Sequence, residues 1–478
     1  MRIVILGAGQ VGSSVAQSLV SEKNDITVVD RDRSRLEWLQ IRLDLRTVAG
    51  DLTQPSVLKD AGLADADMLI AVTQSDETNL VACKLAQKIF NVPTRVARLR
   101  SREFLDSPEL LSDNGFAVSY ALCPEQVITD YLIKLVEFPE ALQVLSFADG
   151  RVALVAVRVN ADGLMVGKPL RKMREHLGEG VEARMVAVYR HDHALSPTGD
   201  LVLEKGDEVF ILAAEENIRR VMVEMRRMMS PVKRIIIAGG GSIGQRLAQR
   251  LENKCTVKII ESNAARAEII ATHLGHGLVL LGDATDEELL EQESIEDTDL
   301  FLALTNKDED NIMAASLAKS MKCKRVLALI NRQVYAELVQ SGPIDIAISP
   351  ALVSIGDLLT HVRHGFVVKV HSLRRGAAEA MELVVHGDQK TSRVVGRRVD
   401  ELPIIPGATL AVIVRAADKP ETIGYEGLFT LVQKPRDQVI MARKNEVIKT
   451  GDHVIVFCLN KRVIKEVEQL FQVKAGFL

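Results

Sequence analysis

The residues best suited to chemistry lie in a short glycine-rich segment near the start of the chain. The sequence ILGAGQVG places Gly7, Gly9 and Gly12 in the spacing GxGxxG, after an apolar run and before an amphipathic one. In a strand–turn–helix, Gly7 permits the tight turn, Gly9 lets the backbone approach a pyrophosphate, and Gly12 allows close helix–strand packing. A helix that begins here presents free N–H groups and positive potential to phosphate. The segment is therefore a candidate nucleotide-binding turn.

An acidic residue follows at the distance that this interpretation needs. Asp30 ends the apolar run DITVVD, where a carboxylate can accept hydrogen bonds from both ribose hydroxyls. An acid at this position disfavours a 2′-phosphate. The sequence therefore favours NAD(H) or another adenine nucleotide over NADP.

Further polar candidates stand at the ends of later apolar runs. Asp51 follows the third run, Thr73 the fourth, and Arg98 ends the fifth, from which it can reach a phosphate or ribose. Thr73 adjoins the topological switch point where such sheets bind ligands. It has a second, compatible interpretation as the N-cap of the next helix, with Asp76 and Glu77 favourable near the helix dipole.

The same arrangement recurs at a spacing of 232 residues. The equivalents are Gly239, Gly241 and Gly244 for the three glycines, Glu261 for Asp30 and Thr305 for Thr73. Ile330 occupies the position of Arg98, although Arg332 lies close by. The second pocket therefore lacks one cation. For either copy, and more so for the second, an alternative is a domain that has kept its glycines for packing and lost its ligand.

The elements that position these residues follow from the hydropathy pattern. In residues 1 to about 120, apolar runs of four to six residues alternate with amphipathic segments, and the repeat has the same pattern. This predicts a doubly wound parallel sheet with strands at IVILG, DITVVD, LRTVAGD, MLIAVT and TRVARL. Residues 140–215 and 366–457 instead predict short strands between Gly-containing turns. The expected fold is α/β: two tandem Rossmann-like domains, each followed by a small β-rich α+β domain.

The boundaries of this organisation can be placed along the chain. We expect the first Rossmann-like domain at 1–123, a helix at 124–139, the first β-rich domain at 140–228, the second Rossmann-like domain at 232–349, a helix at 350–365, and the second β-rich domain at 366–478, with an insert near 419–437. Both helices carry wide apolar stripes. Such a stripe needs a partner, within the chain or from another subunit.

Composition excludes several classes of protein. The net charge of -4 argues against broad nucleic-acid binding, which needs a basic surplus. No apolar run reaches the length of a membrane-spanning helix. The five cysteines are scattered without a CxxC, as in a reducing cytosol. No motif of a catalytic site is present, so we expect no catalytic residues.

Histidine pairs offer only weak metal candidates. His191 and His193 flank Asp192 with metal-like spacing, but a third ligand and a counterpart in the other copy are missing. His361 and His364 lie three residues apart on an expected helix and are predicted to be solvated. We therefore expect no metal site.

Taken together, these motifs resemble the TrkA family, whose paired domains belong to the RCK (also called KTN) class. The resemblance rests on the two GxGxxG turns, on TxSDExN after the fourth strand, and on the GDxV ends of the β-rich domains. Five stretches extend it beyond the class: ILGAGQVG, VTQSDETN, IDIAISP, SLRRG and TSRVVGR. It covers essentially the whole chain and departs only at the insert.

The resemblance implies a cytoplasmic, non-enzymatic regulatory subunit, peripherally associated with the inner face of the membrane. Such subunits are homotetramers that form a gating ring beneath a potassium-translocating protein of the TrkH or TrkG kind. The implied ligands are NAD(H), with ATP or ADP as alternative or additional nucleotides. The helices at 125–138 and 351–364 match those through which such units dimerise.

Family positions also place the ligand contacts. In the first copy they fall on Gly7, Ala8, Gly9, Gln10, Val11, Asp30, Thr73, Gln74 and Arg98, and in the second on Gly239, Gly240, Gly241, Ser242, Ile243, Glu261, Thr305 and Asn306.

Two other classes of protein were weighed against the regulator. An NAD-dependent oxidoreductase with a duplicated dinucleotide-binding domain would need a substrate domain and an acid/base pair, and neither is evident. A redox-responsive DNA-binding regulator would need a helix-turn-helix and a basic face, which the sequence also lacks.

Overall fold

A computed structural model describes residues 1–20, 24–191, 193–228, 230–339, 342–363, 366–373, 377–416 and 437–473. Its contacts group the chain into two units: residues 1–133 with 232–362, and residues 134–231 with 363–478. The insert expected near 419–437 lies, apart from Asp437, outside the described residues. Among the described helices, none combines the length and apolar character needed to span a bilayer.

The first unit contains two parallel sheets of the same topology. In the first sheet the strand order is β3-β2-β1-β4-β5-β6, with every pair parallel. The strands are β1 (Arg2–Leu6), β2 (Asp25–Asp30), β3 (Arg46–Ala49), β4 (Met68–Ala71), β5 (Thr94–Arg98) and β6 (Tyr120–Leu122). The order reverses between β1 and β4, which makes this the switch point of the sheet.

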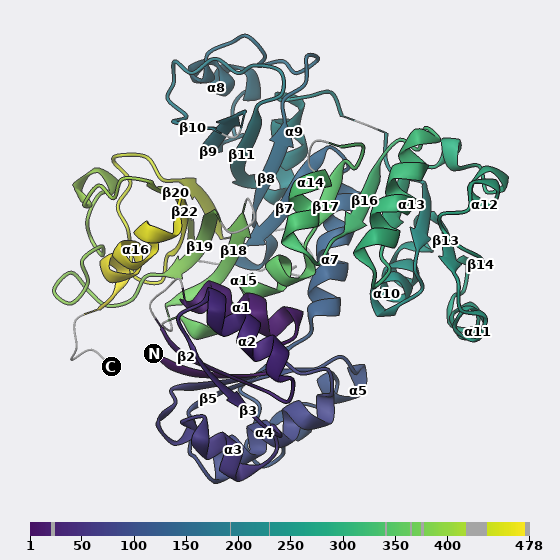
Figure 1. Cartoon of the computed structure of the whole chain (residues 1–478). Coiled ribbons are helices and arrows are strands. Elements are labelled where there is room, and N and C mark those ends of the chain that lie inside the picture. The colour runs from purple at the N-terminus through teal and green to yellow at the C-terminus, as the bar shows by residue number, and fades with distance from the viewer. Residues whose placement is uncertain are drawn as a thin grey trace, which may run out of the picture. The chain divides into compact units, whose positions relative to one another are not determined.

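Helices cover both faces of this first sheet. They are α1 (Gln10–Val20), α2 (Arg33–Arg42), α3 (Pro55–Asp60) and α4 (Asp76–Lys88), followed by the short α5 (Arg102–Leu105) and α6 (Pro108–Leu111). Figure 1 shows α1 and α2 on one face and α3 and α4 on the other. Coverage on both faces explains why every residue of β4 is buried.

The second parallel sheet repeats the first, in the order β14-β13-β12-β15-β16-β17. Its strands are β12 (Arg234–Ala238), β13 (Thr256–Glu261), β14 (Leu278–Leu281), β15 (Leu300–Ala303), β16 (Val326–Leu329) and β17 (Ile346–Ile348). Its helices are α10 (Ser242–Leu251), α11 (Ala264–His273), α12 (Glu287–Gln292), α13 (Asp308–Ser320) and α14 (Gln333–Val339). Each sheet has one more strand than the sequence predicted, since β6 and β17 are only three residues long.

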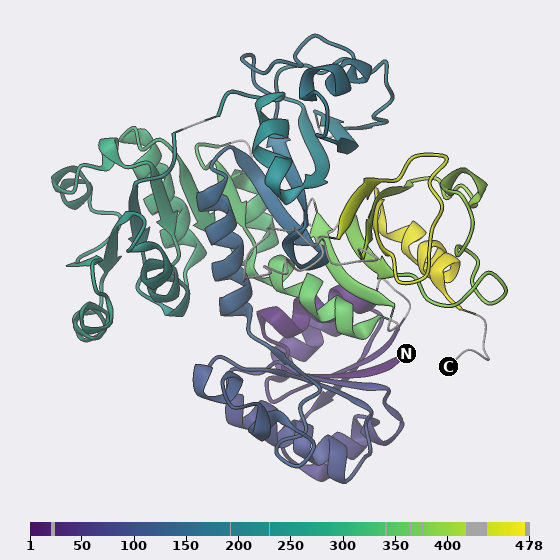
Figure 2. The same cartoon turned by 180° about the vertical axis from the view of Figure 1, so that it is seen from behind.

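A longer helix follows each parallel sheet: α7 (Pro124–Glu137) and α15 (Pro350–Val362). The apolar stripe of α15 is buried, and this helix packs against α1 of the other copy (Figure 2). The N-terminal part of α7 meets α10, where Arg246 Nη1 donates to Gln126 Oε1 at 3.3 Å and Arg250 pairs with Asp130. Each helix therefore finds a partner in the other copy of the same chain.

The second unit contains two antiparallel five-stranded sheets. Their orders are β10-β9-β11-β8-β7 and β18-β19-β22-β20-β21. The strands are β7 (Ala141–Phe147), β8 (Val152–Arg158), β9 (Ala183–Arg190), β10 (His193–Leu195), β11 (Glu208–Ala214), β18 (Val367–Leu373), β19 (Ala378–Val384), β20 (Ala408–Arg415), β21 (Gln438–Met441) and β22 (His453–Cys458). The helices are α8 (Met173–Leu177), α9 (Ile218–Val223) and α16 (Ile464–Phe471). The predicted fold class, with paired parallel and β-rich sheets, is confirmed.

Candidate functional site: one cleft lined by two glycine-rich turns

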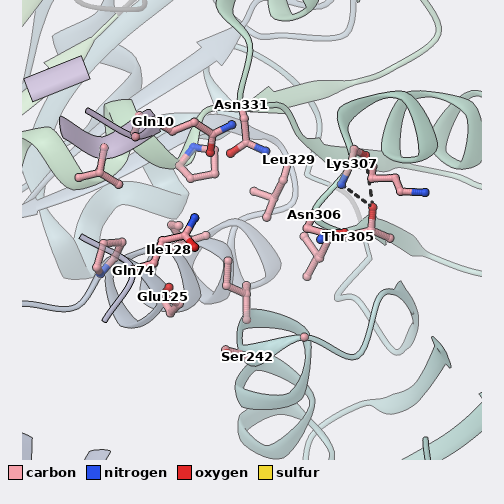
Figure 3. A pocket seen from close by; sticks show the side chains of 18 of the residues that line it. Gln10, Gln74, Glu125, Ile128, Ser242, Thr305, Asn306, Lys307, Leu329 and Asn331 are labelled. Atoms are coloured by element: carbon pink, nitrogen blue, oxygen red, sulfur yellow. Dashed lines mark hydrogen bonds between the residues drawn. The ribbon is translucent and has the colours of Figure 1, made fainter. Parts of the chain in front are cut away.

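Both glycine-rich turns open into one cleft of about 2090 Å³ within the first unit. In Figure 3, Gln10, Gln74, Glu125 and Ile128 of the first copy surround the same space as Ser242, Thr305, Asn306, Leu329 and Asn331 of the second. Pockets for one small ligand usually enclose about 300 to 1,000 Å³. The cleft is therefore large enough for two ligands.

The cleft gathers most of the residues that the sequence predicted. Of the twenty candidates, all but three line it. The exceptions are Gly12, Gly244 and Asp51.

The glycines of each turn are required for different reasons. Gly7 has a φ of +105°, a conformation that favours glycine. A Cβ on Gly12 would collide with the carbonyl oxygen of Gly7, so this residue is required by helix–strand packing. A Cβ on Gly9 would meet nothing within 4 Å. Protein packing alone therefore gives no reason for glycine at position 9, whereas a pyrophosphate approaching the turn does. Gly239, Gly244 and Gly241 repeat these three situations.

The acidic residue after each second strand holds its glycine-rich turn. Asp30 Oδ2 accepts a hydrogen bond from Ala8 N at 2.5 Å, and its Oδ1 accepts one from Asp32 N at 2.9 Å. Glu261 Oε2 likewise accepts from Gly240 N at 3.0 Å, and this side chain is buried. A carboxylate oxygen has two acceptor sites, so each acid retains capacity for a ribose hydroxyl.

Thr73 is not a helix cap, so the N-cap interpretation is wrong. The N-cap of α4 is Ser75, whose hydroxyl accepts from Thr78 N at 3.0 Å. Thr73 Oγ1 instead accepts from Ser75 N at 3.2 Å and donates to Asn79 Oδ1 at 2.8 Å. Thr305 does the same in the second copy, as its contact with Lys307 in Figure 3 shows. The threonine positions the loop that faces the cleft.

Asn79 is a positioning residue that is not among the site residues predicted from the sequence. It is fully buried, accepts from Thr73 N at 3.0 Å and donates to Arg98 O at 2.8 Å. It thereby ties the loop after β4 to the end of β5. Asn311 makes the equivalent bonds to Thr305 and Leu329. The repeated Asn of TxSDExN was the available signal.

Arg98 lines the first pocket in an ion pair with Glu125, the second residue of α7. Arg98 Nη2 donates to Glu125 Oε1 at 2.9 Å, and the two side chains are only 13% and 14% exposed. In the second copy the segment before β16 is one residue shorter, so strand pairing puts Leu329, and not the Ile330 expected from the 232-residue spacing, at the position of Arg98. Ala351 takes the position of Glu125. Both members of the pair are thus replaced together. The sequence offered Arg98 but no signal for its partner.

The second pocket carries cations of its own at the edge of the cleft. Lys307 lies where the first copy has Ser75, and Arg332 follows β16. Both side chains are well exposed, in ion pairs with Asp310 at 3.5 Å and with Glu309 at 3.2 Å. Exposed pairs of this kind exchange readily with other anions.

Asp51 closes the turn after β3 and lies outside the cleft lining. Its Oδ1 accepts from Thr53 N at 2.9 Å and from Thr53 Oγ1 at 2.7 Å, and Arg31 pairs with Oδ2 at 2.6 Å. The Thr53 hydrogen bonds, aided by Arg31, hold the pKa of Asp51 below its usual value. A role of Asp51 in ligand binding stays a prediction.

The histidine candidates have other surroundings. Asp192 and His364 lie outside the described residues, and among the residues that are described no cluster of His, Cys, Asp or Glu is placed to hold a metal. His361 is exposed, as expected, but one face of its ring stacks on Tyr120 with centroids 3.6 Å apart. This packing lowers the pKa of His361 through burial.

Comparison with known proteins agrees with this geometry. The TrkA-N domain model matches residues 3–117 and 235–350, and the TrkA-C domain model matches residues 154–225. The chain is 48% identical over 477 residues to the Trk system potassium uptake protein TrkA of Halomonas elongata, and 47% identical over 479 residues to that of Vibrio alginolyticus. Both alignments cover 100% of each chain. These relatives carry the name of a transport protein and not of an enzyme.

Solved structures share the fold. The chain is similar to the GsuK RCK domain, with a TM-score of 0.60, 18% identity and coverage of 98% of this chain and 94% of that one. It is also similar to the GsuK channel bound to NAD, with a TM-score of 0.59, 17% identity and coverage of 98% and 78%. The duplicated turns, the match of both domain models and the full-length relatives lead to one conclusion: the chain belongs to the TrkA family.

Proposed function

We propose that this chain is the nucleotide-binding regulatory subunit of a Trk-type potassium uptake system. The observation that carries the proposal is the cleft into which both glycine-rich turns open, with Gly9 and Gly241 facing free space. The names of the full-length relatives supply the transport system.

The ligands proposed are NAD(H), ATP and ADP, which share an adenosine and a pyrophosphate. In the first copy the turn from Gly7 to Val11 and the N-terminus of α1 would take the phosphates. Asp30 would take the adenosine ribose, while Thr73 and Gln74 face the ligand from the other side of the switch point. Gly239 to Ile243, Glu261, Thr305 and Asn306 would serve the second copy in the same way. The nucleotide supplies binding free energy and charge, and no reaction is assigned to it.

Regulation follows if the nucleotide binds two arrangements of the subunit unequally, because a ligand with equal affinity for both shifts nothing. Moving a gate from 1:99 to 99:1 takes about 5.5 kcal/mol of differential binding. Shared among four equivalent sites of a homotetramer, this is about 1.4 kcal/mol each, or a tenfold difference in affinity.

The partner proposed is a potassium-translocating membrane protein of the TrkH or TrkG kind. The subunit would lie on the cytoplasmic side of the membrane and assemble as a homotetrameric gating ring. The contacts of α7 and α15 with the other copy's helices are compatible with this arrangement, because they pair the two parallel-sheet domains within the first unit.

The test is potassium flux through a reconstituted TrkH-like protein, with and without this chain. NAD, NADH, ADP and ATP are titrated separately. We expect the chain to alter flux, and at least one nucleotide to change that effect. A potassium flux that none of the four nucleotides changes would refute ligand gating. Turnover of NADH in the same mixture would instead indicate an oxidoreductase.

A further inference from the structure

The first binding site keeps one buried donor and one buried acceptor that no described residue satisfies. These atoms are Arg98 Nε and Glu125 Oε2. The other ends of the same side chains bond each other at 2.9 Å, and both side chains line the cleft. A buried polar atom without a partner is costly in a folded protein. The pair is therefore suited to a ligand group that both accepts and donates a hydrogen bond.

The position of Arg98 and Glu125 relative to the sheet indicates which part of a bound ligand they would contact. A dinucleotide on a doubly wound sheet lies across the switch point, with its adenosine at the end of the second strand. Asp30 ends β2 and Arg98 ends β5, on opposite sides of that point. Arg98 and Glu125 therefore lie where a dinucleotide has its second riboside and where a mononucleotide has its last phosphate.

The second riboside of a dinucleotide and the terminal phosphate of a mononucleotide differ in their hydrogen-bonding chemistry. The hydroxyls of a riboside and the carboxamide of nicotinamide each donate and accept hydrogen bonds, and so can satisfy both orphan atoms. A terminal phosphate only accepts, and its charge meets the carboxylate of Glu125 at low exposure. The first site thus favours the dinucleotide.

The second site has the opposite character. Leu329 and Ala351 replace the pair, and neither side chain can donate or accept a hydrogen bond. Lys307 after β15 and Arg332 after β16 line the cleft with exposed positive charge. This suits an additional phosphate.

We propose that Arg98 and Glu125 make the first site selective for NAD(H), whereas the second site takes adenine mononucleotides. This inference rests on the proposed function, since it assigns ligands to the same two sites.

Calorimetry on the full chain can separate the sites. Glu261→Ala weakens the second site so that the first is measured, and Asp30→Ala does the reverse. In the Glu261→Ala background we expect NADH to bind at least tenfold more tightly than ADP. Adding Arg98→Leu with Glu125→Ala gives the first site the residues of the second, and should bring that ratio close to one. The same pair of substitutions in the Asp30→Ala background is the matched control and should leave the second site's preference unchanged.

Glu125→Gln tests the same point with little change of shape, and should raise ATP affinity several-fold at the first site. An unchanged NADH-to-ADP ratio, or an equal loss of both ligands with the melting temperature preserved, would overturn the proposed selectivity. If the unsubstituted chain binds neither nucleotide, the proposed function itself fails, which is a different result.

Discussion

Arg415 and Asp452 are joined by two parallel hydrogen bonds, from Nε to Oδ1 at 2.8 Å and from Nη2 to Oδ2 at 2.7 Å. Arg190 and Asp207 form the same pair in the first β-rich sheet, at 2.8 Å for both bonds. In each case the arginine ends a strand and the aspartate belongs to the Gly-Asp turn of the sequence repeat. The pair therefore fixes this turn against the sheet.

Removing one member of the pair should be costly. Asp452 is almost fully buried, so Asp452→Ala leaves the mostly buried Arg415 without its carboxylate. We expect the free energy of unfolding to fall by about 3 kcal/mol, measured by urea denaturation. Arg398→Ala is the matched control, because its pair with Asp400 is exposed to solvent and should contribute far less to stability than the buried pair. Equal effects of the two substitutions would contradict this assignment.

The glycines of the first turn should separate ligand binding from stability. Gly9→Ala places a methyl group in open space at the cleft, so we expect a loss of nucleotide affinity of tenfold or more with little change in melting temperature. Gly12→Ala drives a methyl group into the carbonyl oxygen of Gly7, so it should destabilise the fold. Calorimetry and thermal melting of both variants check this. A stable Gly9→Ala variant with normal affinity would show that the first turn holds no phosphate.

Asn79 should contribute to stability through its buried hydrogen bonds. Asn79→Ala removes the acceptor of Thr73 N and the donor to Arg98 O, which leaves two backbone groups unpaired. We expect a loss of about 2 to 3 kcal/mol in the free energy of unfolding. An alanine variant as stable as the parent chain would rule out this tie between β4 and β5.

His371 should make the second unit sensitive to acid. Burial, aided by Lys369, lowers the pKa of His371 to about 4. Its Nε2 contacts Ser146 O at 3.1 Å, so this nitrogen carries the proton of the neutral ring. A histidine with a lowered folded pKa favours the neutral form, so its stability is present above pH 6.5 and is lost as pH falls towards 4.

At pH 4.5 this loss should amount to about 2.5 kcal/mol. His371→Gln keeps a donor for Ser146 O but cannot titrate, so its stability should fall less between pH 7 and pH 4.5. Chemical denaturation at the two pH values measures this difference. Identical losses in parent and variant would mean that other groups cause the acid sensitivity.

The sequence predicted the parallel sheets well because both their strands and their turns repeat. Strands buried on both faces appear as uninterrupted apolar runs, and the glycines mark where each first helix begins. Hydropathy gives no clear sign of the antiparallel strand β19, because it carries Glu379 and Glu382, both buried. Arg363 compensates Glu379 at 2.9 Å, and His453 contacts Glu382 at 2.6 Å. Such partners are far apart in sequence, so local hydropathy gives no sign of them.

In the candidate site, too, residues with a local role could be predicted and residues that depend on distant partners could not. Residues that end strands or form the glycine turns were predictable, because their function depends on local position. Glu125 was not, because its relation to Arg98 exists only once α7 begins beside the end of β5. Asn79 lies in a repeated motif, yet its role depends on the ends of β4 and β5 lying side by side in the sheet.

A single chain that carries both turns is in effect a dimer whose two halves are covalently joined. The proportion of the halves is then always one to one, at any concentration of the protein. In a dimer of identical chains, every substitution would appear in both pockets. Here Arg98 and Glu125 line one pocket, while Leu329 and Ala351 line the other. Because the turns are duplicated within one chain, a substitution can change one pocket and leave the other unaltered, although both pockets open into the same cleft.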